Sequence, residues 1–325
     1  MPFDQSQWLW MNGDVQPWDA ATVHVSAHTL HYGSGVFEGM RCYQTPKGPA
    51  VFRLTEHLDR FYASAAIYQI PIPYTRAELQ DAVHEVIRQN GFESCYIRPI
   101  CFYGSSVLSV HPRSCPVQVV IMAWPWGSYL GDVEDGVRVT VSKWTRFHSS
   151  MMPTVAKACG QYVNSMLANT EAASRGFDEA IMLDSEGYIA EGAGENLFLV
   201  RDGRIITNDQ DSSILMGITR DAVLEIARDR GYEVLISRFK VEDLVAADEA
   251  FFTGTAAEVT PIHEVDGRVI GKGGQGPVTR AIRESFFAIT AGEAPRYEAW
   301  LSYTTKASAA VPMGANPASL QAVPS

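Results

Sequence analysis

Hydrophobic and polar residues follow two different periods along this chain, one typical of helices and one typical of strands. Apolar residues spaced three and four apart predict helices at residues 55–68 and 75–90. In the second segment, Thr75 and Glu78 form a capping box, and Gly91 stands where the helix should end. Segments rich in β-branched and aromatic residues predict strands at 94–103, 117–124 and 137–143.

The second half of the chain shows the same mixture of segment types. Asp202-Gly203 is typical of a hairpin turn, and Pro277 is suited to the first position of a helix. The pattern predicts helices at 157–175, 219–230 and 277–290, and strands at 179–183, 196–200, 204–207 and 249–253. Strands and helices that alternate in this way predict an α/β fold with α+β character.

The length of 325 residues predicts two domains of about 150 residues each. A segment rich in Pro, Gly and acidic residues at 129–137 is interpreted as the connector between them. We therefore expect a small N-terminal α/β domain at 1–128 and a large C-terminal α/β domain at 138–304. The tail at 305–325 has small residues and no periodicity, so we expect it to be disordered.

Composition and charge narrow the class of function. The chain is 46% apolar and 19% charged, as in ordinary globular proteins, and no apolar run reaches the 18 residues or so of a membrane span. The N-terminus lacks a basic segment followed by an apolar one, so no signal peptide is expected. A net charge of −11 without a basic tract argues against a nucleic-acid partner. The five cysteines form no CxxC pair, which argues against a metal site and favours reduced thiols in the cytoplasm.

Among the six lysines, Lys157 has an unusual setting, because no residue within six positions of it is charged. A lysine in apolar surroundings loses hydration, which favours its neutral amine. A neutral amine is what Schiff-base chemistry with a carbonyl requires. The alternative is a lysine whose ammonium group extends out of an apolar patch into water.

Three further segments could contact a flat, phosphorylated ligand. In residues 190–198, glycines allow close approach of the backbone, and Glu191 could pair with a pyridine nitrogen. The helix that begins near Gly217 and the turn at 253–258 could each bind a phosphate. Each segment could equally be an ordinary turn, helix cap or strand end. Taken together with Lys157, however, they are the groups that pyridoxal 5'-phosphate (PLP) requires.

The motifs also resemble those of the branched-chain amino acid aminotransferases, which are PLP enzymes of fold type IV. The resemblance runs from about residue 10 to residue 301. It is carried by HTLHYGSGVFEGMRCY (28–43), VFRLTEHLDRF (51–61), YIRP (96–99), WPWGSYLG (124–131), PTVAKACGQY (153–162), EGAGENLF (191–198), GITRD (217–221) and TGTAAEVTP (253–261).

The resemblance implies a role for each matching position. Lys157 would be the catalytic Schiff-base lysine, and Glu191 would pair with the pyridine nitrogen. Tyr162 would hydrogen-bond the ring hydroxyl. The phosphate would be held by Arg60, Ile218, Thr219 and Thr255. The substrate α-carboxylate would be bound by Tyr96, Thr255 and Ala256. The side-chain pocket would be lined by Tyr32, Phe37, Trp126, Tyr129 and Tyr162, with Arg98 receiving the second carboxylate of glutamate.

The sequence therefore predicts transamination between branched-chain L-amino acids (Leu, Ile, Val) and 2-oxoglutarate, by a two-domain homodimer or larger homo-oligomer. In the family, the loop matching residues 104–112 reaches the substrate pocket of the neighbouring subunit. Small molecules are the expected partners, with no nucleic acid, membrane or metal. Rival functions on the same fold are a D-amino acid or (R)-amine aminotransferase and aminodeoxychorismate lyase. A rival from another class is a non-catalytic binding protein.

Overall fold

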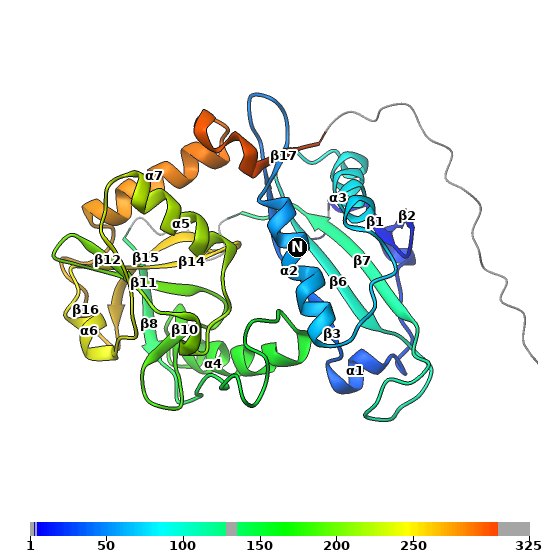
Figure 1. Cartoon of the computed structure of the whole chain (residues 1–325), viewed down its shortest axis with the longest axis horizontal. Helices are drawn as coiled ribbons and strands as arrows, with labels where there is room; N and C mark the ends of the chain where they lie inside the picture. Colours follow the sequence, from blue (N-terminus) through cyan, green and yellow to red (C-terminus); the bar gives the residue numbers. More distant parts are fainter. Residues whose placement is uncertain (1–2, 4, 128–134, 305–325) are drawn as a thin grey trace, which may run out of the picture.

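The chain folds into two lobes, each built on one β-sheet (Figure 1). The computed structural model describes residue 3 and residues 5–127 and 135–304. The mixture of helices and sheets confirms the predicted fold class.

The first sheet is antiparallel throughout. Its strand order is β17 (Leu301–Tyr303), β5 (Ala50–Phe52), β4 (Met40–Tyr43), β6 (Cys95–Tyr103), β7 (Val117–Trp124), β1 (Trp8–Met11) and β2 (Asp14–Pro17), with β3 (Gly35–Phe37) paired to β6. The helices α2 (Leu54–Ile67) and α3 (Arg76–Asn90) contact this sheet and share its core. Ile97 of β6 belongs to that core. Because side chains alternate along a strand, Tyr96 and Arg98 face the opposite side of the sheet.

The second sheet mixes parallel and antiparallel pairs. Its order is β10 (Ile189–Gly192), β9 (Glu179–Leu183), β8 (Val137–Val141), β15 (Glu258–Val265), β14 (Glu249–Gly254), β11 (Asn196–Arg201), β12 (Arg204–Thr207) and β13 (Val234–Ile236), with β16 (Arg268–Val269) paired to β15. The helices α5 (Ile218–Asp229) and α7 (Pro277–Thr290) share a core with β11 and β14. α4 (Tyr162–Ser174) packs on β9.

Short elements complete the chain. They are the helices α1 (His28–Tyr32) and α6 (Val241–Val245) and the 3-10 segments η1 (Trp18–Ala20), η2 (Cys159–Gln161), η3 (Gln210–Ser212) and η4 (Pro295–Trp300). η4 leads into β17, which returns the end of the described chain to the first sheet.

Most predicted elements agree with the structure to within a few residues. The capping box of Thr75 and Glu78 is present, and Gly91 ends α3 in the left-handed conformation. The predicted helix at 157–175 is wrong at its start, because α4 begins only at Tyr162. The 3-10 segment η2 precedes it, and Ala158 before η2 is extended and forms a bridge with Val36 of β3.

The domain boundaries remain a prediction. The predicted tail at 305–325 and most of the predicted connector, residues 129–134, lie outside the described residues.

Candidate active site

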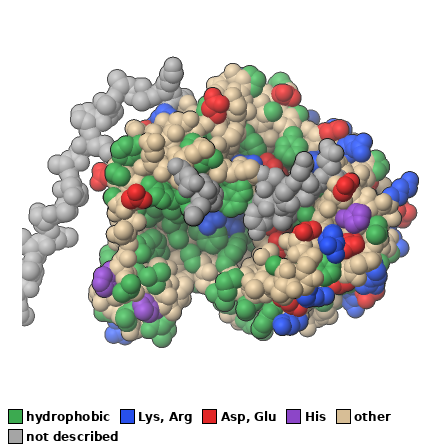
Figure 2. Space-filling model, turned by 180° about the vertical axis from the view of Figure 1, so that it is seen from behind, with side chains coloured by type: hydrophobic (Ala, Val, Ile, Leu, Met, Phe, Trp, Pro, Cys, Tyr) green, Lys and Arg blue, Asp and Glu red, His purple; other side chains and the backbone are tan. Residues whose placement is uncertain are grey.

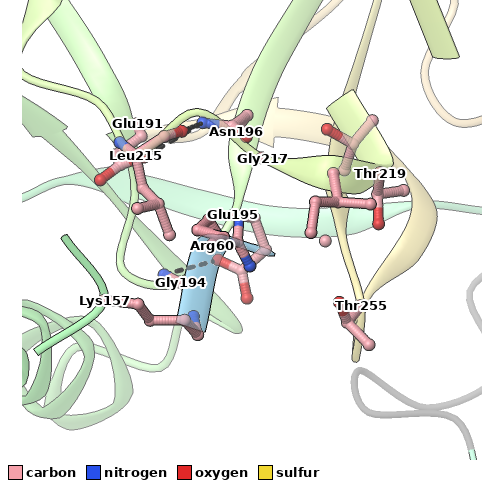
Figure 3. A pocket seen from close by; sticks show the side chains of 13 residues that line it. Arg60, Lys157, Glu191, Gly194, Glu195, Asn196, Leu215, Gly217, Thr219 and Thr255 are labelled. Carbon is pink, nitrogen blue, oxygen red and sulfur yellow. Dashed lines mark hydrogen bonds between the residues drawn. The ribbon is translucent and has the colours of Figure 1, made fainter. Parts of the chain in front are cut away.

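A cavity brings together side chains that are far apart in the sequence. Figure 3 shows Lys157 and Glu191 toward one side of it and Thr219 and Thr255 toward the other. Arg60 of α2 also lines it, so both lobes contribute. Of the predicted catalytic and cofactor-binding residues, the cavity is lined by Arg60, Lys157, Glu191, Ile218, Thr219 and Thr255.

Lys157 is held by its backbone as well as by its side chain. Its carbonyl accepts a hydrogen bond from the Phe37 N–H (3.0 Å), and its own N–H donates to Ser64 Oγ (3.0 Å). Its Nζ lies 2.5 Å from the hydroxyl of Tyr162, the predicted partner of the ring hydroxyl. These contacts hold a half-buried primary amine at the cavity wall.

Glu191 is a buried carboxylate on β10, 5% exposed. Arg146 forms an ion pair with its Oε1 at 2.9 Å, while Asn196 Nδ2 and the Leu215 N–H donate to its Oε2, both at 3.1 Å. Burial raises the pKa of Glu191, although Arg146 and the Leu215 N–H oppose the shift. The carboxylate is therefore fixed in orientation, and a further cation beside it would stabilise its charged form.

Arg60 is oriented by a carboxylate that lies wholly inside the protein. Its Nε and Nη2 donate to the two oxygens of Glu38 at 2.7 and 2.9 Å. His57 Nδ1 lies 2.7 Å from the same carboxylate. Burial alone would raise the pKa of Glu38, but the Arg60 guanidinium and the His57 hydrogen bond outweigh it and hold that pKa well below its usual range.

The remaining walls offer hydrogen-bond donors at the N-terminus of α5. The residue at the N-cap position of α5, Gly217, has no side chain that could accept a hydrogen bond from the first N–H groups of the helix. A Cβ at Gly217 would clash with Asn196 Oδ1, which explains the glycine. Thr253 Oγ1 is buried in the cavity wall without a hydrogen-bond partner among the described residues. Such free donors, with the Arg60 guanidinium beside them, suit a phosphate dianion.

Aromatic side chains and one arginine cluster beside Lys157, whose Nζ lies 5.0 Å from the centre of the Phe37 ring. The ring of Tyr96 lies 4.9 Å from that of Trp126, and Phe37 lies 4.7 Å from Tyr162. Arg98 stacks over Phe37 at 4.7 Å, and its Nη2 lies 3.4 Å from the Tyr96 hydroxyl. Within the described ranges, Arg98 takes part in no ion pair, and its buried Nε has no hydrogen-bond partner. Figure 2 shows hydrophobic side chains gathered around a hollow on one face of the molecule, with basic side chains inside it.

The remaining predicted substrate residues are Tyr32, Tyr129 and Ala256. Ala256 lies in the turn beside Thr255, between β14 and β15. Tyr32 is 45% exposed on α1, and its described ring contacts are with His28 and His31. Tyr129 lies outside the described residues.

Sequence reasoning missed residues that orient the predicted ones. Glu38 stands inside the motif at 28–43, yet no role was assigned to it, and Arg146 lies outside every quoted motif. Glu195 is a further buried carboxylate on the cavity, and its pKa is raised well above the usual value by burial and by the neighbouring Glu179. A buried charge requires a partner, and this requirement was the available signal. It does not identify the residue that serves as the partner.

In the described part of the chain, no group of three or more His, Cys, Asp or Glu side chains could hold a metal ion. None of the helices described is both long enough and apolar enough to cross a membrane.

Comparison with known proteins identifies the family. Residues 35–265 match the family model of amino-transferase class IV. The branched-chain-amino-acid aminotransferases of Pseudomonas aeruginosa and Escherichia coli K12 are 47% and 46% identical, over 91% and 93% of this chain and 97% and 98% of their own.

A solved structure is similar throughout. The T.th. branched-chain amino acid aminotransferase, complexed with N-(5'-phosphopyridoxyl)-L-glutamate, has a TM-score of 0.90 and 50% identity, covering 92% of this chain and 99% of its own. The motifs, the site and these similarities lead to one conclusion: the chain belongs to the class IV aminotransferase family and, within it, to the branched-chain aminotransferases.

Proposed function

We propose that this protein is a PLP-dependent aminotransferase that exchanges the amino group between branched-chain L-amino acids and 2-oxoglutarate, giving branched-chain 2-oxo acids and L-glutamate. The observation that carries the proposal is the single cavity shared by Lys157, Glu191 and Arg60. Relatives that span nearly the whole chain are named as branched-chain aminotransferases, and one was solved with a phosphopyridoxyl-glutamate adduct.

The residues present fit PLP. Thr253 Oγ1 and the uncapped start of α5 are donors without side-chain acceptors, as a phosphate site requires. With Arg60, the residues Ile218, Thr219 and Thr255 would hold the phosphate, and Glu191 would face the ring nitrogen. Tyr162 would bond the ring hydroxyl. When bound, PLP supplies an electron sink for the carbanion that forms at the substrate Cα.

The chain's own residues would then handle the substrate and its proton. The Lys157 amine would take the proton from the substrate Cα and deliver it to the C4′ atom of the cofactor, with the Tyr162 hydroxyl as its neighbour. Tyr96 and the turn at Thr255 and Ala256 would bind the α-carboxylate. Phe37, Trp126 and Tyr129 would contact the apolar side chain, and Arg98 would bind the second carboxylate of glutamate.

We further propose that the active unit is a homodimer or a larger homo-oligomer. Tyr32, Leu108 and Val110 are exposed apolar residues, with Val110 83% exposed. The His28 ring ties α1 to the 104–112 loop, because its Nε2 lies 2.7 Å from the Ser109 carbonyl. This unit could complete the substrate pocket of a neighbouring copy. All five cysteines are free, which supports a reducing compartment, the cytoplasm.

The proposed reaction is tested with a panel of amino donors and 2-oxoglutarate as acceptor. L-Leucine, L-isoleucine and L-valine should all yield glutamate, and Lys157→Ala should abolish the yield while retaining the fold. Borohydride should fix the cofactor to Lys157 in the wild type, as mass spectrometry can show. Preference for D-leucine or for an (R)-amine would contradict the proposal, as would a label on Lys143 or Lys240.

A second prediction concerns the recognition of two unlike substrates in one pocket. Arg98→Met retains much of the stem and removes the charge, so glutamate should lose a charge-assisted bond of about 1.5–3 kcal/mol, tenfold or more in efficiency. Leucine should be largely unaffected. Each donor is measured in its own half-reaction. Equal losses for both donors would mean that Arg98 supports the architecture only.

A third prediction follows from the Glu38–Arg60 pair. Glu38→Gln leaves the Arg60 cation without its counter-charge, so the apoprotein should lose about 3 kcal/mol of stability at pH 7 and bind PLP more weakly. The pKa of Glu38 is lower in the folded state than in the unfolded state, where it is about 4.3. Glu38 therefore makes its full contribution to the free energy of unfolding above about pH 4.3, and this contribution declines as the pH falls further.

Urea unfolding of both apoproteins between pH 7 and pH 3 measures this difference. The stability gap between wild type and variant should narrow below about pH 4.3. Glu85→Gln, which breaks the more exposed pair with Arg88, is the control and should cost at most about 1 kcal/mol. A gap that stays constant down to pH 3 would show that Glu38 is not held ionised.

A further inference from the structure

A cluster of three polar side chains joins the two sheets beside the cavity. Glu258, the first residue of β15, accepts a hydrogen bond from the Tyr43 hydroxyl at 2.8 Å. Its other oxygen lies 3.6 Å from Arg41 Nη1. Arg41 and Tyr43 both belong to β4, so the contacts run from one sheet to the other. The Arg41 and Glu258 side chains are each only 14% exposed, so water screens their attraction weakly.

Glu258 closes the turn that carries two of the proposed carboxylate-binding residues. It pairs with Gly254, and the turn between them holds Thr255 and Ala256. Its backbone is left-handed, with φ of 55°, an uncommon conformation for a residue with a side chain. Such a conformation persists only where neighbouring contacts enforce it, and the contacts with β4 do so here.

Arg41 also lies beside two other segments of the proposed substrate pocket, the chain after β7 and the strand that carries Tyr96. Its Nη2 donates to the carbonyls of Trp126 and Gly127, both at 3.3 Å, where the chain leaves the first sheet. In the sheet register, Arg41 lies directly opposite Tyr96. Directly opposed residues share one face of a sheet, so Arg41 flanks the Tyr96 ring. From this position opposite Tyr96, one guanidinium contacts both the chain after β7 and the residue that closes the turn.

We propose that Arg41, Tyr43 and Glu258 are positioning residues that set the geometry of the substrate-carboxylate pocket across the two sheets. The inference rests on the proposed function, since it takes Tyr96, Thr255 and Ala256 as the carboxylate site. Arg41 and Glu258 act as a pair: Glu258 fixes the turn, and Arg41 fixes Glu258. The simpler alternative is that Arg41 attracts the substrate carboxylate directly by its charge.

The two roles predict opposite signs for one substitution. Glu258→Gln releases the turn from Arg41, so a positioning role predicts weaker carboxylate binding. If Arg41 acted by its charge alone, the same change would remove a competing anion, and carboxylates would bind more tightly. Arg41→Met weakens carboxylate binding under either role, so Glu258→Gln is the deciding variant.

The probes are 4-methylvaleric acid, which is leucine without its amino group, and the neutral 4-methylvaleramide of the same shape. Each is titrated into PLP-loaded wild type, Arg41→Met, Tyr43→Phe and Glu258→Gln, and the visible absorbance of the bound cofactor is followed. We expect the acid to bind about tenfold more weakly to Arg41→Met and Glu258→Gln, because small displacements of positioned groups have effects of this order. The amide should change by less than about twofold, and Tyr43→Phe should lie between.

Kinetics and a double variant give an independent readout. The KM for leucine should rise in these variants far more than kcat falls. The double variant, Arg41→Met with Glu258→Gln, should weaken acid binding little more than either single variant, because the two residues act through each other. Arg138→Met breaks a cross-strand ion pair with Glu264 elsewhere on the second sheet and should leave every value unchanged.

Two results would overturn the proposal: unchanged or tighter acid binding in Glu258→Gln, or equal weakening of acid and amide. If Arg41→Met fails to fold, Tyr43→Phe and Glu258→Gln decide the question alone. Failure of the proposed function would look different, because the wild type itself would then not transfer the amino group of leucine.

Discussion

The site depends on one buried negative charge, the carboxylate of Glu191. Burial raises the pKa of this carboxyl group, while Arg146 and the Leu215 N–H oppose the shift and, with Asn196, fix its orientation. Those partners come from three different segments, and Asn196 and Leu215 also line the cavity. A site that must hold a cationic ring nitrogen would be assembled in this way, with the anion oriented before the ligand arrives.

Two more arginine–glutamate pairs repeat this arrangement around the cavity. Glu38 orients Arg60 of the proposed phosphate site, and Glu258 meets Arg41 beside the proposed carboxylate pocket. Each pair joins segments far apart in the sequence. The Arg60 guanidinium donates to both oxygens of Glu38, which is a planar, directional contact, whereas Arg41 and Glu258 attract each other at 3.6 Å. These charges orient the groups around the cavity, whereas Phe37, Tyr96 and Trp126 would supply apolar area for the side chain of the proposed substrate.

The sequence predicted those features that depend on local pattern. The caps of α3 at Thr75 and Gly91 and the strands β6 and β7 follow from residue spacing and turn residues. Lys157 could be singled out by its uncharged neighbours, but its backbone hydrogen bonds could not, because they are made to Phe37 of β3 and to Ser64. The partners of buried charges were also beyond reach, since Arg146 meets Glu191, and Arg41 meets Glu258, only through the tertiary fold.

The central claim is that Glu191 holds the ring nitrogen of bound PLP in its protonated form. The most direct measurement is the nitrogen-15 NMR shift of ring-labelled PLP in the wild type and in Glu191→Gln. The account predicts a protonated nitrogen in the wild type and an unprotonated one in the variant, with turnover reduced by more than about tenfold, or about 1.4 kcal/mol. An unprotonated nitrogen in the wild type, or the same shift and turnover in both proteins, would contradict it.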